Sequence, residues 1–255
     1  MKGFAAFVRK EAVEIVRTWR IWVLPGILLV FAVTGPLTAK YTPEIIASVG
    51  GSQMAAIAKV IPVPTYVDAY AQWIKNLSQI ALFAIIIIYG GLVSAESKSG
   101  TAVLVLTKPV SRAAFVVAKA LVHSTFLALT VLVGTLITWA GTLLLFGTAP
   151  AGPLFAAAGA WLVFGVLFVA LMTLLSVLVS SQAGAAGIGL GVYALVSISA
   201  IWEPVAKYSP AALAGQPMAI AAGQGVDVTW PIVTSLLLSA ALVTLAVWAF
   251  RRKEL

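Results

Sequence analysis

Six long runs of apolar residues, separated by shorter polar stretches, dominate the pattern along the chain. A helix needs about 20 apolar residues to cross a hydrocarbon core of about 30 Å, because each residue adds about 1.5 Å. The runs are apolar without alternation, and in lipid only helices and closed barrels satisfy every backbone polar group. We therefore predict an all-α integral membrane protein. Its six transmembrane helices are predicted at about residues 21–39, 76–95, 118–146, 154–180, 183–202 and 230–250.

The first 20 residues follow a different pattern, in which apolar and charged side chains fall on opposite sides of a helix. At about 100° per residue, one arc collects the apolar residues Phe4, Val8, Ala12, Ile15, Val16 and Trp19. The other arc collects the charged residues Lys2, Arg9, Lys10, Glu14, Arg17 and Arg20. A basic face opposite an aliphatic and aromatic face is typical of a helix in the membrane interface. We predict such a helix over residues 1–20, followed by a transmembrane domain over residues 21–255. A solvated helix docked on a partner protein is the alternative.

Three polar segments between the predicted spans are longer than a simple turn requires. Residues 40–75 contain the stretch Ile45–Val60, which we predict as a short surface helix. Residues 96–112 form a charged loop, and residues 203–229 form an irregular segment with three prolines. The third span is longer than a crossing needs, so we place its start in the membrane interface.

Charge is scarce and unevenly distributed. Only 9% of the residues are charged and 62% are apolar, whereas about a quarter of a soluble domain is usually charged. Of the 16 Lys and Arg residues, 12 lie on the predicted side that holds both termini, and four lie opposite, namely Lys40, Lys59, Lys75 and Lys207. Positive residues stay on the cytoplasmic side. We predict a multi-pass protein of the cell membrane with cytoplasmic termini. The net charge of +8 then reflects topology and lipid, with no nucleic acid as partner.

The residues that carry catalytic chemistry are mostly missing. The chain has no GxxxxGK[ST] motif for a triphosphate, no GxSxG nucleophile elbow, no cysteine and one histidine, His123, which we predict to be interfacial or packed. No acidic residue lies in the middle of a predicted span, although ion-driven transporters keep such groups there. We predict no catalytic site, no metal and no cofactor in this chain. An intramembrane enzyme lacks a buried nucleophile and base, and a channel lacks a filter segment.

The loop over residues 96–112 is the most informative polar segment. It is basic, yet it contains the apolar run Ala102–Leu106. Ser99 or Thr101 is placed to cap a short helix that Pro109 must end. Exposed aliphatic side chains in a cytoplasmic loop need a cover. We favour a docking surface for a cytoplasmic partner, and the alternative is that the run dips into the membrane interface.

The residues around this loop resemble a known family of membrane subunits. The loop pattern is Glu96-x3-Gly100-Thr101, then Leu106-x2-Pro109-Val110-x-Arg112, then Phe115-x3-Lys119. It resembles the signature of type-2 ATP-binding-cassette (ABC-2) permeases, and the start with Arg9-Lys10-Glu11, Glu14 and Arg17 is similar to the elbow helix of that family. The resemblance covers nearly the whole chain. It is greatest to small single-domain bacterial permeases, including those similar to the copper-site maturation permease of nitrous-oxide reductase operons.

The resemblance implies two permease chains, as a homodimer or heterodimer, and two separate ATPase subunits that hold ATP and magnesium. The loop would contain the coupling helix that contacts the ATPase. In that picture Glu96 and Arg112 anchor the loop through ion pairs, Gly100 allows a close turn and Pro109 fixes the exit. The implied coupling residues are Glu96, Gly100, Thr101, Leu104, Leu106, Pro109 and Arg112. Residues 203–229 resemble the outer re-entrant region, where Glu203 and Lys207 would pair at an outer gate.

The function expected from the sequence is therefore the permease subunit of a bacterial ABC transporter, an exporter driven through the 96–112 loop. The alternative is a membrane scaffold or accessory subunit that binds cytoplasmic partners without moving a substrate. The substrate is left open by the sequence.

Overall fold

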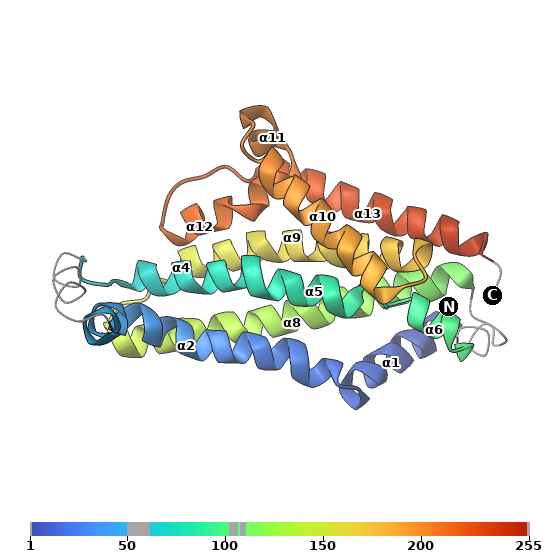
Figure 1. The fold of residues 1–255 in the computed structure, drawn as a ribbon, viewed down its shortest axis with the longest axis horizontal. Coiled ribbons are helices and arrows are strands. Elements are labelled where there is room, and N and C mark those ends of the chain that lie inside the picture. Colours follow the sequence, from blue (N-terminus) through green and yellow to red (C-terminus); the bar gives the residue numbers. More distant parts are fainter. Residues whose placement is uncertain (1, 50–61, 102–106, 108–110, 254–255) are drawn as a thin grey trace.

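The computed structural model describes residues 2–49, 62–101, 107 and 111–253. Every regular element in that part of the chain is helical (Figure 1). Six of the helical stretches are long and apolar enough to cross a membrane. The prediction of an all-helical protein with six candidate spans is confirmed.

The helices follow the six predicted spans, with additional short helices between them. Their bounds are α1 Lys2–Arg17, α2 Arg20–Val49, α4 Tyr66–Asn76, the π-helical η1 Leu77–Ala81, α5 Leu82–Tyr89, α6 Ser94–Lys98, α8 Arg112–Phe146, α9 Ala151–Leu178, α10 Gln182–Ser199, α11 Glu203–Tyr208, the 3₁₀-helical η2 Pro210–Ala214, α12 Gln216–Ala221 and α13 Thr229–Arg251. The second candidate span runs through α4, η1, α5 and α6.

Helix α2 continues ten residues beyond the predicted end at residue 39, to Val49. The predicted separate surface helix at Ile45–Val60 is therefore wrong at its start, and residues 50–60 lie outside the described part of the chain. Lys40 does not end the span, because its ammonium donates a 2.6 Å hydrogen bond to the carbonyl of Leu145, in the last turn of α8. A cation is favourable there, since the carbonyls at a helix C-terminus carry partial negative charge.

The second span begins ten residues earlier than predicted, at Tyr66. Asp68 in its first turn accepts a 2.7 Å hydrogen bond from the backbone N–H of Thr65, as in a capping box. The prediction started at residue 76 because Asp68 and Lys75 interrupt the apolar pattern. Charged residues in a first turn are compatible with a helix that extends past the hydrocarbon core.

Helix α9 is the centre of the bundle, and α5, α8, α10, α12 and α13 all pack against it. Its core includes Trp161, Phe164 and Phe168, all of which are buried. Within the most apolar 18-residue stretch of α9, 67% is buried inside the protein, whereas 17% is buried in the corresponding stretch of α10 and of α13. A helix that is apolar on all sides needs apolar surroundings. Protein supplies them for α9, while α10 and α13 present apolar surface to the outside.

Helices α4 and α8 approach closely at Gly134. The indole ring of Trp73 is fully buried there, and its N–H donates a 3.1 Å hydrogen bond to the hydroxyl of Thr135. A Cβ atom at Gly134 would lie 2.5 Å from a ring carbon of Trp73. Glycine is therefore required for this helix contact.

The segment at residues 203–229 is more regular than predicted. It contains α11, η2 and α12, and α12 packs against α9 and α4. Pro204 is compatible with α11 because it lies in the first turn, where its missing N–H would have no intrahelical acceptor. The segment therefore folds back onto the bundle.

Both ends of the described chain lie at the end of the bundle that carries α6 and the 96–112 loop (Figure 1). An even number of crossings requires this arrangement of the termini. The twelve clustered positive residues make this end the predicted cytoplasmic one.

Candidate functional site

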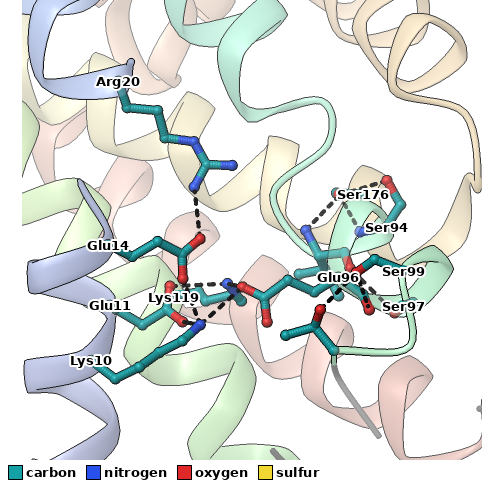
Figure 2. Close-up of polar contacts among 12 residues, drawn as sticks. Lys10, Glu11, Glu14, Arg20, Ser94, Glu96, Ser97, Ser99, Lys119 and Ser176 are labelled. Atoms are coloured by element: carbon teal, nitrogen blue, oxygen red, sulfur yellow. Dashed lines mark hydrogen bonds and ion pairs between the residues drawn. The ribbon is translucent and has the colours of Figure 1, made fainter. Parts of the chain in front are cut away.

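Six charged residues from four helices meet at the base of the 96–112 loop (Figure 2). They are Lys10, Glu11 and Glu14 on α1, Arg20 at the start of α2, Glu96 on α6 and Lys119 on α8. We call these six residues the ion-pair cluster. It contains three cations and three carboxylates, so its formal charge at neutral pH is zero.

Lys119 is the centre of the cluster and is fully buried. Its Nζ lies 2.9 Å from Oε2 of Glu11 and 2.5 Å from Oε1 of Glu96. Glu11 is also fully buried, and Glu96 nearly so. A buried charge is tolerated only when it is paired and hydrogen-bonded. These three side chains therefore depend on one another, although they come from three separate helices.

Lys10 closes the cluster on the side of α1 that faces solvent. Its Nζ lies 2.9 Å from Glu11, 2.6 Å from Glu14 and 3.2 Å from Glu96. Arg20 adds a longer contact of 3.7 Å to Glu14. Lys10 thus shares two carboxylates with Lys119, and α1 is tied both to α6 and to α8.

The ionisation of the α1 residues is set by these contacts. Burial alone would lower the pKa of Lys10, but hydrogen bonds to Glu14 and Glu11 and the charges of Glu11 and Glu96 raise it above its ordinary value of 10.5. Burial alone would raise the pKa of Glu14, but the hydrogen bond from Lys10 and the nearby positive charges lower it below 4.5. Both groups are therefore charged at neutral pH.

Glu96 is positioned by contacts at both ends of α6. The hydroxyl of Ser176 on α9 accepts hydrogen bonds from the backbone N–H groups of Val93 (2.8 Å) and Ser94 (3.0 Å). After α6, Gly100 has φ of +73°, a left-handed conformation that favours glycine. Figure 2 shows Glu96 pointing from α6 toward Lys119, with the Ser94–Ser176 contact behind it. The start of the loop is thus fixed to α9, to α8 and to α1.

Arg112, where the loop enters α8, has different partners from those expected. Its Nη1 donates hydrogen bonds to the carbonyls of Phe250 (3.3 Å), Arg251 (3.0 Å) and Lys253 (2.7 Å). Within residues 111–253 and the other described ranges, Arg112 forms no ion pair, whereas Glu96 does. The reason is that the last turn of α13 ends beside Arg112, and its free carbonyls attract a cation.

The other predicted site residues are placed only in part. Thr101 lies at the edge of the described segment, with its hydroxyl 2.9 Å from that of Ser99. The predicted residues Leu104, Leu106 and Pro109 lie outside the described residues. The contact of this loop with an ATPase stays a prediction.

The predicted pair at the outer gate does not form. Among the described residues no ion pair joins Glu203 and Lys207, although both lie on α11. Lys207 instead lies with its ammonium 5.3 Å from the ring centroid of Tyr208. Exposed charges at i, i+4 gain little from pairing, so this geometry is unsurprising.

Lys10, Glu11 and Lys119 were missed as site residues by the sequence reasoning. The face of α1 that packs on the protein holds Phe7, Glu11 and Ile15, all buried at i, i+4 and i+8. The predicted apolar face shares only Ile15 with it. A carboxylate between two apolar residues on one helical stripe was the available signal, because such a group needs a buried cation.

The three carboxylates of the cluster do not require a metal ion. Oxygen atoms of Glu11, Glu14 and Glu96 lie within 4.8 Å of one another, a spacing at which carboxylates hold cations. The ammonium groups of Lys10 and Lys119 lie against the same oxygens. Their positive charge supplies the neutralisation that a bound cation would provide.

His123 lies one turn beyond Lys119 on α8 and is fully buried. Its ring packs edge-on against Tyr89, with ring centroids 4.9 Å apart. Of the two predicted environments for His123, interfacial or packed, the structure shows the packed one.

Comparison with known proteins adds the family and the membrane location. The model of the family described as "Protein of unknown function (DUF2705)" matches residues 59–255. The chain belongs to this family. It is also similar to a protein described as "Uncharacterized transmembrane protein YxlG" of Bacillus subtilis (strain 168), with 27% identity over 257 residues, covering 100% of this chain and 99% of the relative. The relative's description agrees with the six candidate spans, and this member of the DUF2705 family is a transmembrane protein.

Proposed function

We propose that this chain is the permease subunit of an ATP-binding-cassette transporter, an exporter driven by a separate cytoplasmic ATPase through the 96–112 loop. The observation that carries the proposal is the binding of Glu96, at the base of that loop, to the buried Lys119 and to Lys10. The resemblance of the loop and of α1 to ABC-2 permeases supports the same assignment.

The ion-pair cluster gives this loop a mechanical connection to the transmembrane helices. Pulling Glu96 away from Lys119 would leave buried charges without partners, and breaking a buried ion pair costs about 3–5 kcal/mol. The elements α1, α6 and the start of α8 are therefore expected to move together. A partner that displaces the loop would displace all three.

Helix α8 is suited to carry such a displacement across the membrane. Its 35 residues span about 50 Å at 1.5 Å per residue, which exceeds the thickness of the hydrocarbon core. Lys119 lies near one end, and the carbonyl of Leu145 at the other end binds Lys40 of α2. Movement at the loop would in this way reach the opposite end of α2 and α8.

The proposal assigns the energy source and the remaining surface to partners. ATP and magnesium belong to the ATPase, since the chain carries no P-loop motif. The weakly buried helices α10 and α13 are available to membrane lipid and to a second permease chain. The end that carries α6 and both termini is assigned to the cytoplasm of a bacterial cell.

The proposal is tested by purifying the full chain with its bound partners from the cells that make it. We expect a nucleotide-hydrolysing subunit to co-purify, and we expect the isolated chain to hydrolyse no ATP. Glu96→Gln and Gly100→Ala should leave membrane insertion intact and abolish the effect of the chain on the rate of ATP hydrolysis. Lys75→Gln, an exposed change at the other end of the bundle, is the matched control.

Three results would contradict the proposal. These are hydrolysis by the chain alone, no co-purifying ATPase, and normal behaviour of both the Glu96 and the Gly100 variants. An ATPase that binds the chain but whose rate is independent of it, with no transported substrate, would favour the scaffold alternative.

A further inference from the structure

A second feature of α1 lies on the face that the ion-pair cluster does not use. Helices α1, α2 and α8 enclose a groove of about 520 Å³. Its walls include Ala12 and Val16 of α1, Pro25 of α2, and Leu129 and Val133 of α8. This is the face of α1 that the sequence pattern predicted to be apolar.

The groove offers almost no polar group to a ligand. Of its 14 lining residues, only Thr125 and Thr130 carry polar side chains. Both hydroxyls already donate to carbonyls of their own helix, at 2.9 and 2.8 Å. A ligand for this groove must therefore be a hydrocarbon along its length.

The groove has the length and the position of one lipid chain. Along α8 its lining runs from Leu121 to Val133, and the 12 steps between these residues rise about 18 Å. One leaflet of the hydrocarbon core is about 15 Å thick, half of about 30 Å. The groove begins two residues after Lys119, at the level of the ion-pair cluster. The strongly exposed Trp19 and Trp22 at the corner between α1 and α2 are typical of the headgroup level.

Free positive charge lies on the polar arc of α1, beside the arc that lines the groove. Arg9 and Arg17 are exposed, and neither forms an ion pair or a side-chain hydrogen bond within the described part of the chain. Lys10, Arg20 and Lys119, in contrast, are occupied by carboxylates. Arg9 precedes Ala12 by three residues and Val16 by seven, which places it at the edge of the polar arc nearest to the groove. Arg17 lies further round the polar arc, eight residues or about 12 Å along the helix.

We propose that the groove between α1, α2 and α8 binds one acyl chain of an anionic phospholipid, whose phosphate is held by Arg9 and Arg17. The apolar walls select a lipid chain, and the unpaired guanidinium groups select a negatively charged headgroup over a zwitterionic one. This site is independent of the proposed transport function, because it does not involve the 96–112 loop or an ATPase.

The experiment titrates the delipidated full chain in detergent with phosphatidylglycerol or with phosphatidylcholine of the same acyl chains, and counts bound lipid by native mass spectrometry. We expect one tightly bound phosphatidylglycerol, and weaker binding of phosphatidylcholine. The double change Arg9→Gln and Arg17→Gln should weaken phosphatidylglycerol binding about thirty-fold, which corresponds to about 1 kcal/mol for each basic residue. The same double change at Arg251 and Arg252, which also removes two positive charges at this end, should leave the affinity unchanged.

A second pair of variants tests the groove itself. Ala12→Phe places a ring in the groove and should abolish tight binding, whereas Ala6→Phe, on an exposed part of α1 outside the groove, should not. Equal binding of both lipids, or wild-type binding by Ala12→Phe or by the Arg9 and Arg17 variant, would overturn the proposal. A change of oligomeric state in Ala12→Phe without loss of lipid would also overturn it, because the groove would then belong to an interface between copies of the chain.

Discussion

The replacement Lys119→Met is the most direct test of the ion-pair cluster. It keeps the length of the side chain but removes the fully buried one of the two cations that contact both Glu11 and Glu96. The cluster then changes from neutral to a formal charge of −1, with Lys10 as the remaining cation beside two buried carboxylates. Removing one partner of a buried ion pair costs about 3–5 kcal/mol, because it leaves an uncompensated charge in a medium of low polarity. We expect a loss of this size in the free energy of unfolding.

The companion variant removes the opposite charge. Glu11→Gln alone leaves Lys119 with Glu96 only, and we expect a comparable loss. In the double variant Lys119→Met, Glu11→Gln the four remaining charged residues are again neutral in sum. Its loss should therefore be smaller than the sum of the two single losses, by about 2 kcal/mol.

The free energies can be measured by reversible unfolding of the purified chain in mixed detergent micelles, followed by the fluorescence of its eight tryptophans. Lys75→Met, which removes an exposed lysine outside the cluster, is the control and should change stability by no more than about 0.5 kcal/mol. If Lys119→Met behaves like this control, or if the two single losses simply add, the cluster does not hold the three helices together.

Three further outcomes follow from individual contacts. Gly134→Ala should destabilise the chain by about 1–3 kcal/mol, because the added methyl group collides with the buried ring of Trp73. Gly159→Ala, in open space on α9, should be neutral or stabilising. If an unfolding titration gives the two alanine variants the same free energy of unfolding, the argument is refuted. The pKa of Glu14 is lower in the folded chain than its ordinary value. Its contribution to the free energy of unfolding is therefore fully present above about pH 4.5 and is lost as the pH falls through the pKa of the folded chain. The free energy of unfolding, measured from pH 6 to pH 3, should show this loss, and the loss should be smaller in Glu14→Gln. If the free energy depends on pH equally in the two proteins, the ion pair is excluded. Arg112→Gln should cost about 1–3 kcal/mol, through lost bonds to the end of α13. Amide hydrogen exchange in the last turn of α13 should then accelerate, and an unchanged rate would contradict the capping role.

The number and class of the elements were readable from the sequence. Crossing a membrane requires a run of apolar residues of a given length, and this is a local property of the chain. All six predicted spans overlap a candidate span of the structure. The errors lie at the ends, because residues 40–75 were taken as an outer segment, whereas α2 continues past Lys40 to Val49 and α4 begins at Tyr66, before Asp68. Lys40 and Asp68 each have a nearby backbone partner, which a hydropathy pattern does not show.

The candidate site was readable only in part. The resemblance to ABC-2 permeases implied roles for Glu96 and Gly100 at the base of the 96–112 loop, and the structure places Glu96 in ion pairs and Gly100 in a left-handed turn. The partners of Glu96 were not identified. Lys119 is 23 residues away and Lys10 is 86 residues away, and periodicity relates residues only within one helix.

The sequence by itself therefore determined the lipid-embedded class of the protein, the number of its spans and the distribution of its positive charge, because each depends on residue type and on neighbours along the chain. Only the tertiary structure decided which face of α1 is buried. Amphipathicity indicated the apolar arc, but the charge of Lys119 required a carboxylate, and this turned Glu11 inward. That choice left the apolar arc free to line the groove beside α2 and α8.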